Sequence, residues 1–384
     1  MNGSARPLKN SLVSLYRAAL EGVDPGRAVK RSLSDPAIGR ALAKAQHIGM
    51  FAVGKAARGM AEGARSILWD EGLTILPRGY SRGRLARSRV LIASHPLPDR
   101  SSVRAAEAAL AFFAGFGPRD LILCLISGGT SSLLAKPRPG LTLAAKRTAI
   151  RRLVSSGASI IELNRLRSRL SAVKAGKLGR ATPARIVSLV LSDVPGDDPA
   201  VVGSGPTVRG HRGDRTRVVA SNRSGMRASA AEALRRGLVP IFFRRRLAGE
   251  AFDEGRRFAR AAARLPPGQV LVGGGETTVS LSDRPGRGGR NLEFALGAAA
   301  ELDGATDLAV LSAGSDGVDG NSRAAGAFVD GATMERARSL GIDPGRGLAR
   351  HDTEPFFRRL GDLLVTGPTG TNVGDWAWAM RKRR

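Results

Sequence analysis

The chain has 384 residues and a formal net charge of +28, from 61 lysines and arginines against 33 aspartates and glutamates. Its length predicts two domains, because a single hydrophobic core stops growing beyond about 250–300 residues. Its one cysteine, Cys124, excludes an internal disulfide framework and a cysteine zinc site. The N-terminus lacks a signal-peptide pattern, and no apolar run approaches the roughly 18–20 residues that span a bilayer. We therefore expect a cytoplasmic protein with no membrane partner.

The positive charge has two interpretations. A strongly basic protein ordinarily suggests a nucleic-acid or other anionic partner. Here the basic residues are spread from Arg6 to Arg384, many of them on alanine-rich stretches such as 226–236 and 254–264, without interleaved aromatic residues to stack bases. The clusters at 244–246 and 381–384 are candidates for non-specific polyanion binding. We favour a merely basic surface over a nucleic-acid partner.

Hydrophobic residues make up 42% of the chain and it contains 49 glycines, which predicts a turn-rich α/β protein. Residues 8–46 are predicted to form two amphipathic helices that break near Asp24-Pro25-Gly26. A buried strand follows and ends in Gly54-Lys55, where a helix begins. An ammonium beside a helix N-terminus suits phosphate, although the full Walker spacing is missing. An ordinary turn with a solvated lysine is the alternative.

Further strands are predicted at 73–76, 90–94 and 121–126. The second ends in Ser94-His95-Pro96, where His95 is either a site residue or, more often for a lone histidine, structural. The third runs into Ser127-Gly-Gly-Thr-Ser-Ser132. Its glycines permit close backbone approach, and the helix that follows offers N–H groups and hydroxyls, so we expect an anion-binding turn there.

A strand over 186–191 delivers the next group of polar residues. It ends in Ser192-Asp193, continues through a turn with Asp197 and Asp198, and reaches Ser204-Gly-Pro-Thr207. Three aspartates facing a glycine-hydroxyl turn suit a site that handles Mg²⁺ and phosphate. A surface turn with solvated aspartates is the alternative.

Strands at 217–220 and 239–243 flank a helix at 225–236, and Pro266-Pro267-Gly268 reads as a linker. Beyond it, strands at 269–272, 307–311 and 363–365 again end in glycine turns, over 273–278, 312–320 and 366–372. No G-x-G-x-x-G fingerprint with a spaced acid is found, which argues against a standard dinucleotide site. Two lobes with such turns suit a phosphate-rich ligand and phosphoryl transfer.

These residues carry a resemblance to a known family. The chain resembles the class II glycerate kinases, also called the MOFRL family and often labelled hydroxypyruvate reductases. The motifs occur in family order over nearly the whole chain: Val53-Gly-Lys-Ala-Ala57, Ser94-His-Pro-Leu-Pro-Asp99, Leu125-Ile-Ser-Gly-Gly129, Leu191-Ser-Asp-Val-Pro-Gly-Asp-Asp198, Ser204-Gly-Pro-Thr207, Gly274-Gly-Glu-Thr-Thr278, Gly288-Gly-Arg-Asn291, Asp316-Gly-Val-Asp-Gly320 and Thr366-Gly-Pro-Thr-Gly-Thr-Asn-Val373.

The resemblance implies an α/β fold with an N-terminal Rossmann-like domain over 1–250, a helix and linker over 251–267, and a smaller MOFRL domain with a mixed sheet over 268–384. It implies a cleft between the domains in which ATP phosphorylates D-glycerate, most commonly at the 2-hydroxyl, with ATP and Mg²⁺ as cofactors. A homodimer is a further expectation.

The resemblance also assigns roles to residues of this chain. We expect Lys55, Asp193, Arg290 and Asp316 to be catalytic, and Asp193 and Asp197 to hold the metal. Arginine can hold the carboxylate of glycerate bidentately, and a carboxylate can accept the proton of the reacting hydroxyl. The expected nucleotide-binding residues are Ser127, Gly128, Gly129, Thr130, Ser131, Ser204, Gly205, Thr207, Gly274, Glu276, Thr277 and Asn372.

The chain departs from the family pattern at several positions. Arg323 stands where the family usually has an aspartate, and Lys174-Ala175-Gly176 stands for Lys-Gly-Gly. The charge reversal at residue 323 leaves open a relative that acts on another small hydroxy acid. Two further alternatives are a hydroxypyruvate reductase, as the common family label suggests, and a non-catalytic anion-binding protein that uses the basic surface.

Overall fold

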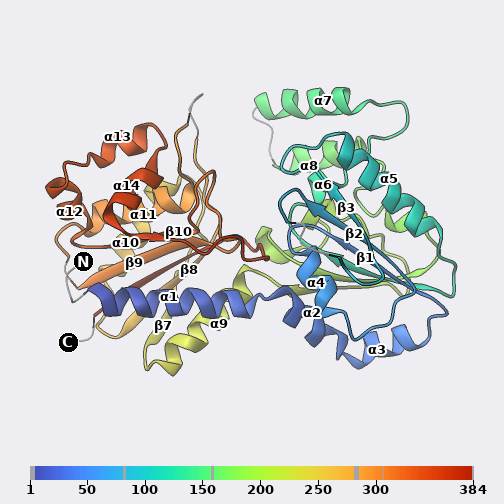
Figure 1. The fold of residues 1–384 in the computed structure, drawn as a ribbon, viewed down its shortest axis with the longest axis horizontal. Helices are drawn as coiled ribbons and strands as arrows, with labels where there is room; N and C mark the ends of the chain where they lie inside the picture. The colour runs from blue at the N-terminus through green and yellow to red at the C-terminus, as the bar shows by residue number, and fades with distance from the viewer. Residues whose placement is uncertain (1–4, 81–83, 157–159, 281–284, 306, 383–384) are drawn as a thin grey trace. The chain divides into compact units, whose positions relative to one another are not determined.

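The structure is a computed structural model that describes residues 5–80, 84–156, 160–280, 285–305 and 307–382 (Figure 1). The chain divides into two compact units. The parallel-sheet unit comprises residues 24–221 and 370–372, and the mixed-sheet unit comprises 1–23, 222–369 and 373–384. Each is described by itself.

The parallel-sheet unit is built on a sheet with the strand order β3-β2-β1-β4-β5-β6, in which the neighbouring strands all run parallel. This is the order of a Rossmann fold, and it confirms the predicted fold class for this part of the chain. The strands are β1 (Ile48–Val53), β2 (Glu71–Pro77), β3 (Arg89–Ala93), β4 (Leu121–Ile126), β5 (Arg185–Leu191) and β6 (Arg215–Ala220).

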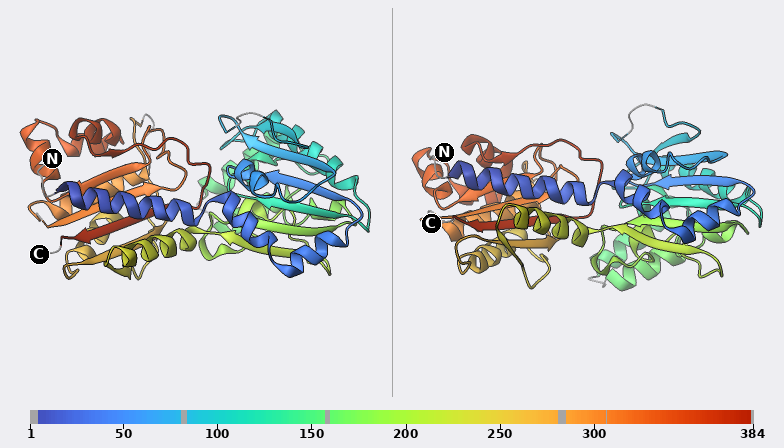
Figure 2. Two further views of the ribbon diagram at one scale, coloured as in Figure 1. Left: turned by 60° about the horizontal axis from the view of Figure 1, so that its bottom comes forward. Right: turned by 90° about the horizontal axis from the view of Figure 1, so that it is seen from below.

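Both faces of this sheet are covered, which explains why its central strands are apolar along their whole length. Phe51 and Val53 of β1 and alternate residues of β4 pack against α5 (Arg100–Ala114). On the other face, α2 (Pro25–Leu33) and α4 (Ala57–Gly63) pack against each other and against the sheet. Figure 2 shows these layers from two sides. Cys124 is buried in β4, as expected for a small core residue.

The remaining helices of this unit are α3 (Pro36–Ala43), α6 (Thr130–Leu133), α7 (Leu143–Ser155), α8 (Ile160–Arg169) and the single 3₁₀ turns η1 (Gly179–Ala181), η2 (Pro195–Asp197) and η3 (Val202–Ser204). The prediction of two helices over 8–46 is wrong, because the chain breaks twice. Asp24 caps α2 and Asp35 caps α3, and a proline follows each cap at the first helical position. The second Asp-Pro pair starts a helix just as the first does.

The mixed-sheet unit has the strand order β11-β10-β9-β12-β8-β7. Only β7 and β8 run parallel among the described pairs, so the predicted mixed sheet is confirmed. The strands are β7 (Val239–Phe242), β8 (Gln269–Gly275), β9 (Leu308–Gly314), β10 (Gly326–Asp330), β11 (Leu363–Leu364) and β12 (Asp375–Arg381). The sequence reading missed β10 and β12, although β12 lies at the centre of the sheet.

The side chains of strand β12 alternate strictly between the two faces of the mixed sheet. Trp376 and Trp378 face α1 (Ala5–Gly22), where Tyr16 meets both indole rings edge-on at centroid distances of 6.4 and 6.0 Å. Ala377 and Ala379 face the opposite core, which α10 (Ala251–Ala262) and α11 (Arg290–Leu302) complete. The large rings fill the space under two helices, and the small residues let the other pair approach.

The other helices of the mixed-sheet unit are α9 (Asn222–Arg235), which packs against α1, and a group near the end of the sequence: α12 (Thr333–Ser339), α13 (Pro344–Ala349) and α14 (Thr353–Leu360). The division into units differs from the expected boundaries at residues 250 and 268. Residues 5–22 and 222–250 pack with the later part of the chain because α1 and α9 cover the tryptophan face of β12. None of the helices in the described ranges is both long and apolar enough to cross a bilayer.

Gly225 of α9 tests this packing. A Cβ at this position would lie 2.2 Å from Cζ2 of the buried Trp376 ring, which has no room to move. We expect Gly225→Ala to lower the free energy of unfolding by about 1–3 kcal/mol, as overpacking does. Gly39→Ala in α3 is the control, because a Cβ there meets nothing within 4 Å. It should raise stability by about 0.5–1 kcal/mol through helix propensity alone. Denaturant unfolding of both variants measures this, and equal effects would contradict the packing.

Candidate functional site

The parallel sheet changes winding direction between β1 and β4. From this pair, β2 and β3 continue to one side and β5 and β6 to the other. In such sheets, ligands bind outside the carboxyl ends of the strands at the point where the order reverses. Here those ends carry Gly54-Lys55 after β1 and Ser127-Gly128-Gly129 after β4, as the sequence reading expected.

The two turns are locked together by hydrogen bonds. The Lys55 N–H donates to the Gly128 carbonyl at 2.9 Å, and the Ala56 N–H donates to Ser127 Oγ at 3.1 Å. The Thr130 hydroxyl donates to the carbonyl of Val53 in β1 at 3.2 Å. Ser127 and Thr130 therefore use their hydroxyls to fix the turns, which places their role in positioning the site.

The glycines of these turns are required by close neighbours. Gly54 has φ +119°, and a Cβ there would lie 2.2 Å from Ser127 Oγ. At Gly128 a Cβ would lie 2.1 Å from Asp193 Oδ2 and 3.0 Å from Asn372 Nδ2. The backbone of Gly128 is thus in contact with a carboxylate from the end of β5 and with an amide from the 370–372 segment.

Gly129 adds two further groups to the same place. It has φ +88°, and a Cβ there would lie 3.1 Å from the His95 ring and 3.5 Å from Cγ of Lys55. The Gly128-Gly129 turn is therefore surrounded by Lys55, His95, Asp193 and Asn372. Glycine backbone beside an ammonium and a helix start is an arrangement suited to an anion. His95, left open between site and structure at the sequence level, lies against this turn.

The loop that carries Ser204 contacts α6, the short helix that follows the Gly128-Gly129 turn. Ser131 Oγ lies 3.2 Å from Ser204 Oγ. The segment after α8 holds the Ser204 loop in place. The Ala175 N–H donates to the Ser204 carbonyl at 2.9 Å, and the Gly176 N–H donates to the Gly205 carbonyl at 2.7 Å. Thr207, at the end of this loop, is buried and its hydroxyl pairs with Ser188 of β5 at 2.8 Å. That hydroxyl anchors the loop to the sheet.

The aspartates expected to hold a metal do not form a closed cage. Asp197 lies in the η2 turn with φ +55°, and its N–H donates to the Val194 carbonyl at 3.4 Å. Within the described ranges, no group of three or more His, Cys, Asp and Glu side chains is arranged to hold a metal ion. A site that uses one or two carboxylates and leaves the rest to phosphates and water is the arrangement Mg²⁺ favours.

In the mixed-sheet unit, Arg290 is the centre of a charged network. Its Nη2 donates to Asp375 Oδ1 at 3.1 Å, its Nε donates to Asp375 Oδ2, and its Nη1 lies 3.0 Å from Glu276 Oε1. Burial lowers the pKa of Arg290, but the carboxylates of Asp375 and Glu276 outweigh it and raise the pKa overall. Among the described residues, these contacts use three of the five guanidinium N–H groups, which leaves two for a ligand.

Asp319 and Asn291 fix the start of α11, where Arg290 stands. The Asp319 carboxylate accepts the N–H groups of Asn291 at 3.0 Å and Leu292 at 2.9 Å. Burial raises the pKa of Asp319 to about 7, against the lowering effect of these donors. The Asn291 amide also donates to Asp375 at 3.1 Å, so the whole network holds Arg290 in one orientation.

The other expected site residues of this unit differ in their contacts and burial. Asp316 follows β9, where its carbonyl accepts the Thr369 N–H at 3.1 Å and its carboxylate accepts the Val318 N–H at 3.3 Å. Gly274 packs against Asn222 of α9, because a Cβ there would lie 2.1 Å from Asn222 Oδ1, and Thr277 is buried. Arg323, the main departure from the family pattern, is exposed. Sequence reading missed Asp375, because it looked for polar residues at the carboxyl ends of predicted strands and Asp375 is the first residue of β12, which was not predicted.

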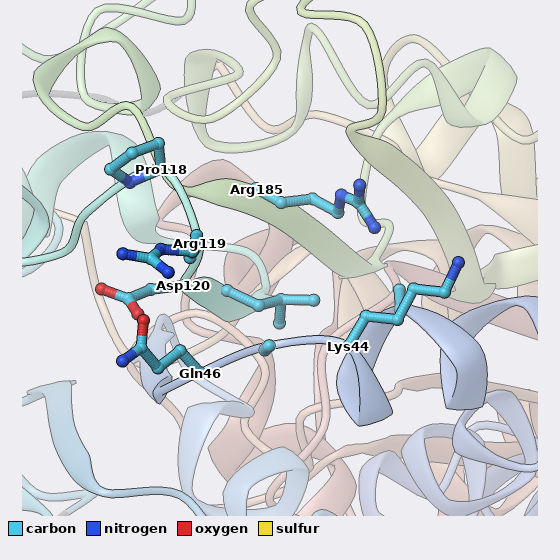
Figure 3. A pocket seen from close by; sticks show the side chains of 9 residues that line it. Lys44, Gln46, Pro118, Arg119, Asp120 and Arg185 are labelled. Carbon is cyan, nitrogen blue, oxygen red and sulfur yellow. The ribbon is translucent and has the colours of Figure 1, made fainter.

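A separate cavity of about 360 Å³ lies at the amino-terminal ends of the parallel strands, opposite the glycine turns (Figure 3). It is lined by the first residues of β4 and β5 and by Lys44, Arg119 and Asp120. The Asp120 carboxylate already accepts the N–H groups of Gly117 at 2.7 Å and His47 at 3.2 Å. The amino ends of parallel strands are not where this fold places its chemistry, so the cavity is not the candidate site.

Asp375 tests the Arg290 network. Its side chain is 5% exposed, and Asp375→Ala leaves Arg290 with Glu276 as its carboxylate partner among the described residues. We expect a loss of about 3 kcal/mol in the free energy of unfolding, at the low end for breaking a buried pair, because Arg290 is one-third exposed. The matched control is Asp303→Ala. Asp303 makes the same forked contact to Arg338, at 2.8 and 3.1 Å, but on the surface. It should cost less than about 1 kcal/mol. Equal losses would show that Asp375 is not a buried anchor.

Two family models match this chain. Residues 11–238 match the model described as a domain of unknown function, DUF4147, and residues 269–375 match the MOFRL family. A glycerate 2-kinase from Pyrococcus horikoshii is 33% identical over 94% of each chain. A protein from Agrobacterium vitis that is provisionally named a hydroxypyruvate reductase is 39% identical over 94% of this chain and 92% of its own.

The fold is shared with a solved structure as well. The crystal structure of a glycerate kinase from Thermotoga maritima superposes with a TM-score of 0.88 at 31% identity, covering 98% of this chain and all of that one. Two family models that together match residues 11–238 and 269–375, relatives above 30% identity over nearly the full length, and a common fold lead to one conclusion. The chain belongs to the DUF4147–MOFRL family, whose members include the glycerate kinases.

Proposed function

We propose that this protein is an ATP-dependent glycerate kinase that phosphorylates D-glycerate, at the 2-hydroxyl. The observation that carries the proposal is the interlocked pair of turns after β1 and β4, which gathers Lys55, Asp193 and glycine amides at the switch point of the sheet. Similarity to glycerate 2-kinases over 94% of the chain supports the same activity. Together they favour a small hydroxy acid as acceptor and a nucleotide as donor.

The turn of Gly128 and Gly129 is suited to the phosphates of the nucleotide. Its backbone can approach a ligand closely, because neither residue has a side chain and both neighbours are polar. The Lys55 ammonium stabilises negative charge on the transferred phosphoryl group, which is the main requirement for this reaction. Phosphoryl transfer needs positioning and charge stabilisation more than covalent chemistry, and the rigid turns supply the positioning.

The acceptor requires a cation for its carboxylate and a base for its hydroxyl. Arg290 has two N–H groups left and is held in one orientation by Asp375 and Asn291. It is our candidate for binding the glycerate carboxylate. Asp193 and Asp316 are the candidates for accepting the hydroxyl proton. Mg²⁺ would be held by Asp193, with Asp197 as the second candidate, and would neutralise charge on the nucleotide phosphates.

A hydroxypyruvate reductase is the second candidate, since the Agrobacterium vitis relative carries that name and the parallel sheet has the Rossmann order. The turn after β1 reads Gly54-Lys55-Ala56-Ala57 rather than a dinucleotide fingerprint, which favours the kinase. Oxidation of NADH in the presence of hydroxypyruvate would reverse that preference. Cytoplasmic location and a homodimer stay predictions.

Lys55 tests the kinase proposal. The wild-type protein should release ADP when mixed with MgATP and D-glycerate, and Lys55→Ala should lower kcat/KM by about 10²–10³-fold because it removes a charge that faces the phosphates. Coupling the product directly to enolase, without a mutase, identifies the 2-phosphate. Lys44→Ala is the control: Lys44 is also in the parallel-sheet unit but lines the cavity at the amino-terminal ends of the strands (Figure 3). Loss of activity in the Lys44 variant but not in the Lys55 variant would move the site to that cavity.

Asp193 tests the metal assignment. We expect Asp193→Asn to raise the Mg²⁺ concentration for half-maximal activity by about tenfold or more, because an amide is a weaker ligand for a hard cation than a carboxylate. Asp198→Asn is the matched control, since Asp198 is exposed and its carboxylate accepts the N–H of Ala200, two residues later, at 2.9 Å. A fall in kcat for the Asp193 variant at an unchanged Mg²⁺ requirement would instead indicate a base.

A further inference from the structure

Four basic side chains gather behind the loop pair that carries Ser131 and Ser204. They are Lys146 on α7, Arg167 on α8, and Lys174 and Lys177 on the segment that follows α8, and we call them the cation cluster. Lys174 is 5% exposed and Lys146 only 3%. Lysines are almost never so deeply buried unless they have a charged partner.

The partners of these lysines are all neutral. Lys174 Nζ donates to the Ser131 hydroxyl, and Lys146 Nζ donates to the Ala135 carbonyl at 3.3 Å. Lys177 donates to the carbonyls of Ser168 and Ser171 at 2.8 and 2.7 Å. Across the described ranges, no Asp or Glu forms an ion pair with Lys146 or Lys174 in this structure.

This arrangement disfavours the charged form of both buried lysines. Burial, followed by the charges of Lys146 and Arg167, lowers the pKa of Lys174 to about 7. Burial, then the charge of Lys177, lowers the pKa of Lys146 to about 8. Two buried ammonium groups that have no carboxylate partner within the described ranges destabilise the free protein. A bound anion would remove that cost.

The location indicates where the anion would lie. Ser131 follows Gly128-Gly129 after a single intervening residue, and its hydroxyl contacts both Lys174 and Ser204. Lys174 is therefore one hydrogen bond away from the helix that begins at the glycine turn. The cluster and the turn offer ammonium, hydroxyl and amide donors side by side, the set that a phosphate group accepts.

We propose that Lys174, supported by Lys146 and Arg167, binds a phosphate group next to the Ser131 and Ser204 hydroxyls. This inference rests on the proposed function for the origin of the phosphate, which is either the polyphosphate of the nucleotide or the phosphate of the product. The proposal adds Lys174, Lys146 and Arg167 to the site, residues to which the sequence alone assigned no role.

Isothermal titration calorimetry with tripolyphosphate, 2-phosphoglycerate and D-glycerate tests the inference on the full chain. Lys174→Met keeps the length and apolar stem of the side chain and removes the charge. We expect it to weaken binding of at least one phosphate ligand by about tenfold or more, the cost of losing a charged donor. Tripolyphosphate alone would identify the nucleotide chain, and 2-phosphoglycerate alone would identify the product phosphate. D-glycerate binding should change less than about twofold, within the range of a surface substitution.

A melting curve without ligand separates binding from a structural role. Since the charge of Lys174 is uncompensated, Lys174→Met should melt at the wild-type temperature or above it, and the phosphate-induced rise in Tm should be lost. Lys30→Met, on the exposed face of α2, should behave as wild type in both measurements. Lys146→Met provides a second variant with the same expectation, should the first fail to fold.

Unchanged affinity for both phosphate ligands in the two cluster variants would overturn the inference. So would a parallel fall in ligand-free Tm and affinity, because that is the pattern of a lysine needed only for packing. The outcome is independent of the kinase proposal. A protein that binds tripolyphosphate through Lys174 but shows no turnover with D-glycerate would retain the phosphate site and refute the glycerate kinase.

Discussion

The candidate site depends on one short set of hydrogen bonds between neighbouring strand ends. The Lys55 N–H to Gly128 carbonyl bond and the Ala56 N–H to Ser127 hydroxyl bond join the turns after β1 and β4 into a single rigid piece. Without this link, each glycine turn would be a flexible loop, and the approach of Asp193 and His95 to the turn would not be fixed. Backbone groups make the first bond, and the second depends on one side chain, that of Ser127. The chemistry is therefore attached to the most rigid place that the sheet offers.

The two units differ in how their buried or half-buried cationic side chains are partnered. In the mixed-sheet unit, the charge of Arg290 is paired with the carboxylates of Asp375 and Glu276 before any ligand binds. In the parallel-sheet unit, Lys146 and Lys174 are buried against neutral groups. The first arrangement orients a group, and the second leaves electrostatic energy to be recovered by an anion. Such a division suits an enzyme, because one unit keeps a binding side chain oriented at all times and the other gains stability only when an anion binds.

The sequence predicted the parallel sheet well because the signals there are local. Each buried strand is a continuous apolar run, and each is followed by glycine beside Ser, Asp or Lys, so β1, β4 and β5 and their turns were found together. The mixed sheet was harder to predict. Strand β12 alternates tryptophan with alanine and ends in basic residues, and β10 is a short run that begins in glycine and alanine. Their identity as strands comes from long-range pairing with β9. Buried lysines could not be predicted either, since no local pattern distinguishes Lys174 from a solvated lysine.

The position of β12 has a consequence for how this chain is made. The strand lies between β8 and β9 and pairs with both, yet it is among the latest segments in the sequence. As the chain leaves the ribosome, residues 24–221 can assemble their sheet early, because its six strands are already present and their neighbours are near in sequence. Helix α1, synthesised first, must wait for Trp376 and Trp378 before its apolar face is covered. During that interval β8 and β9 lack the partner that joins them. We therefore expect the nascent mixed-sheet unit to be the segment that chaperones engage.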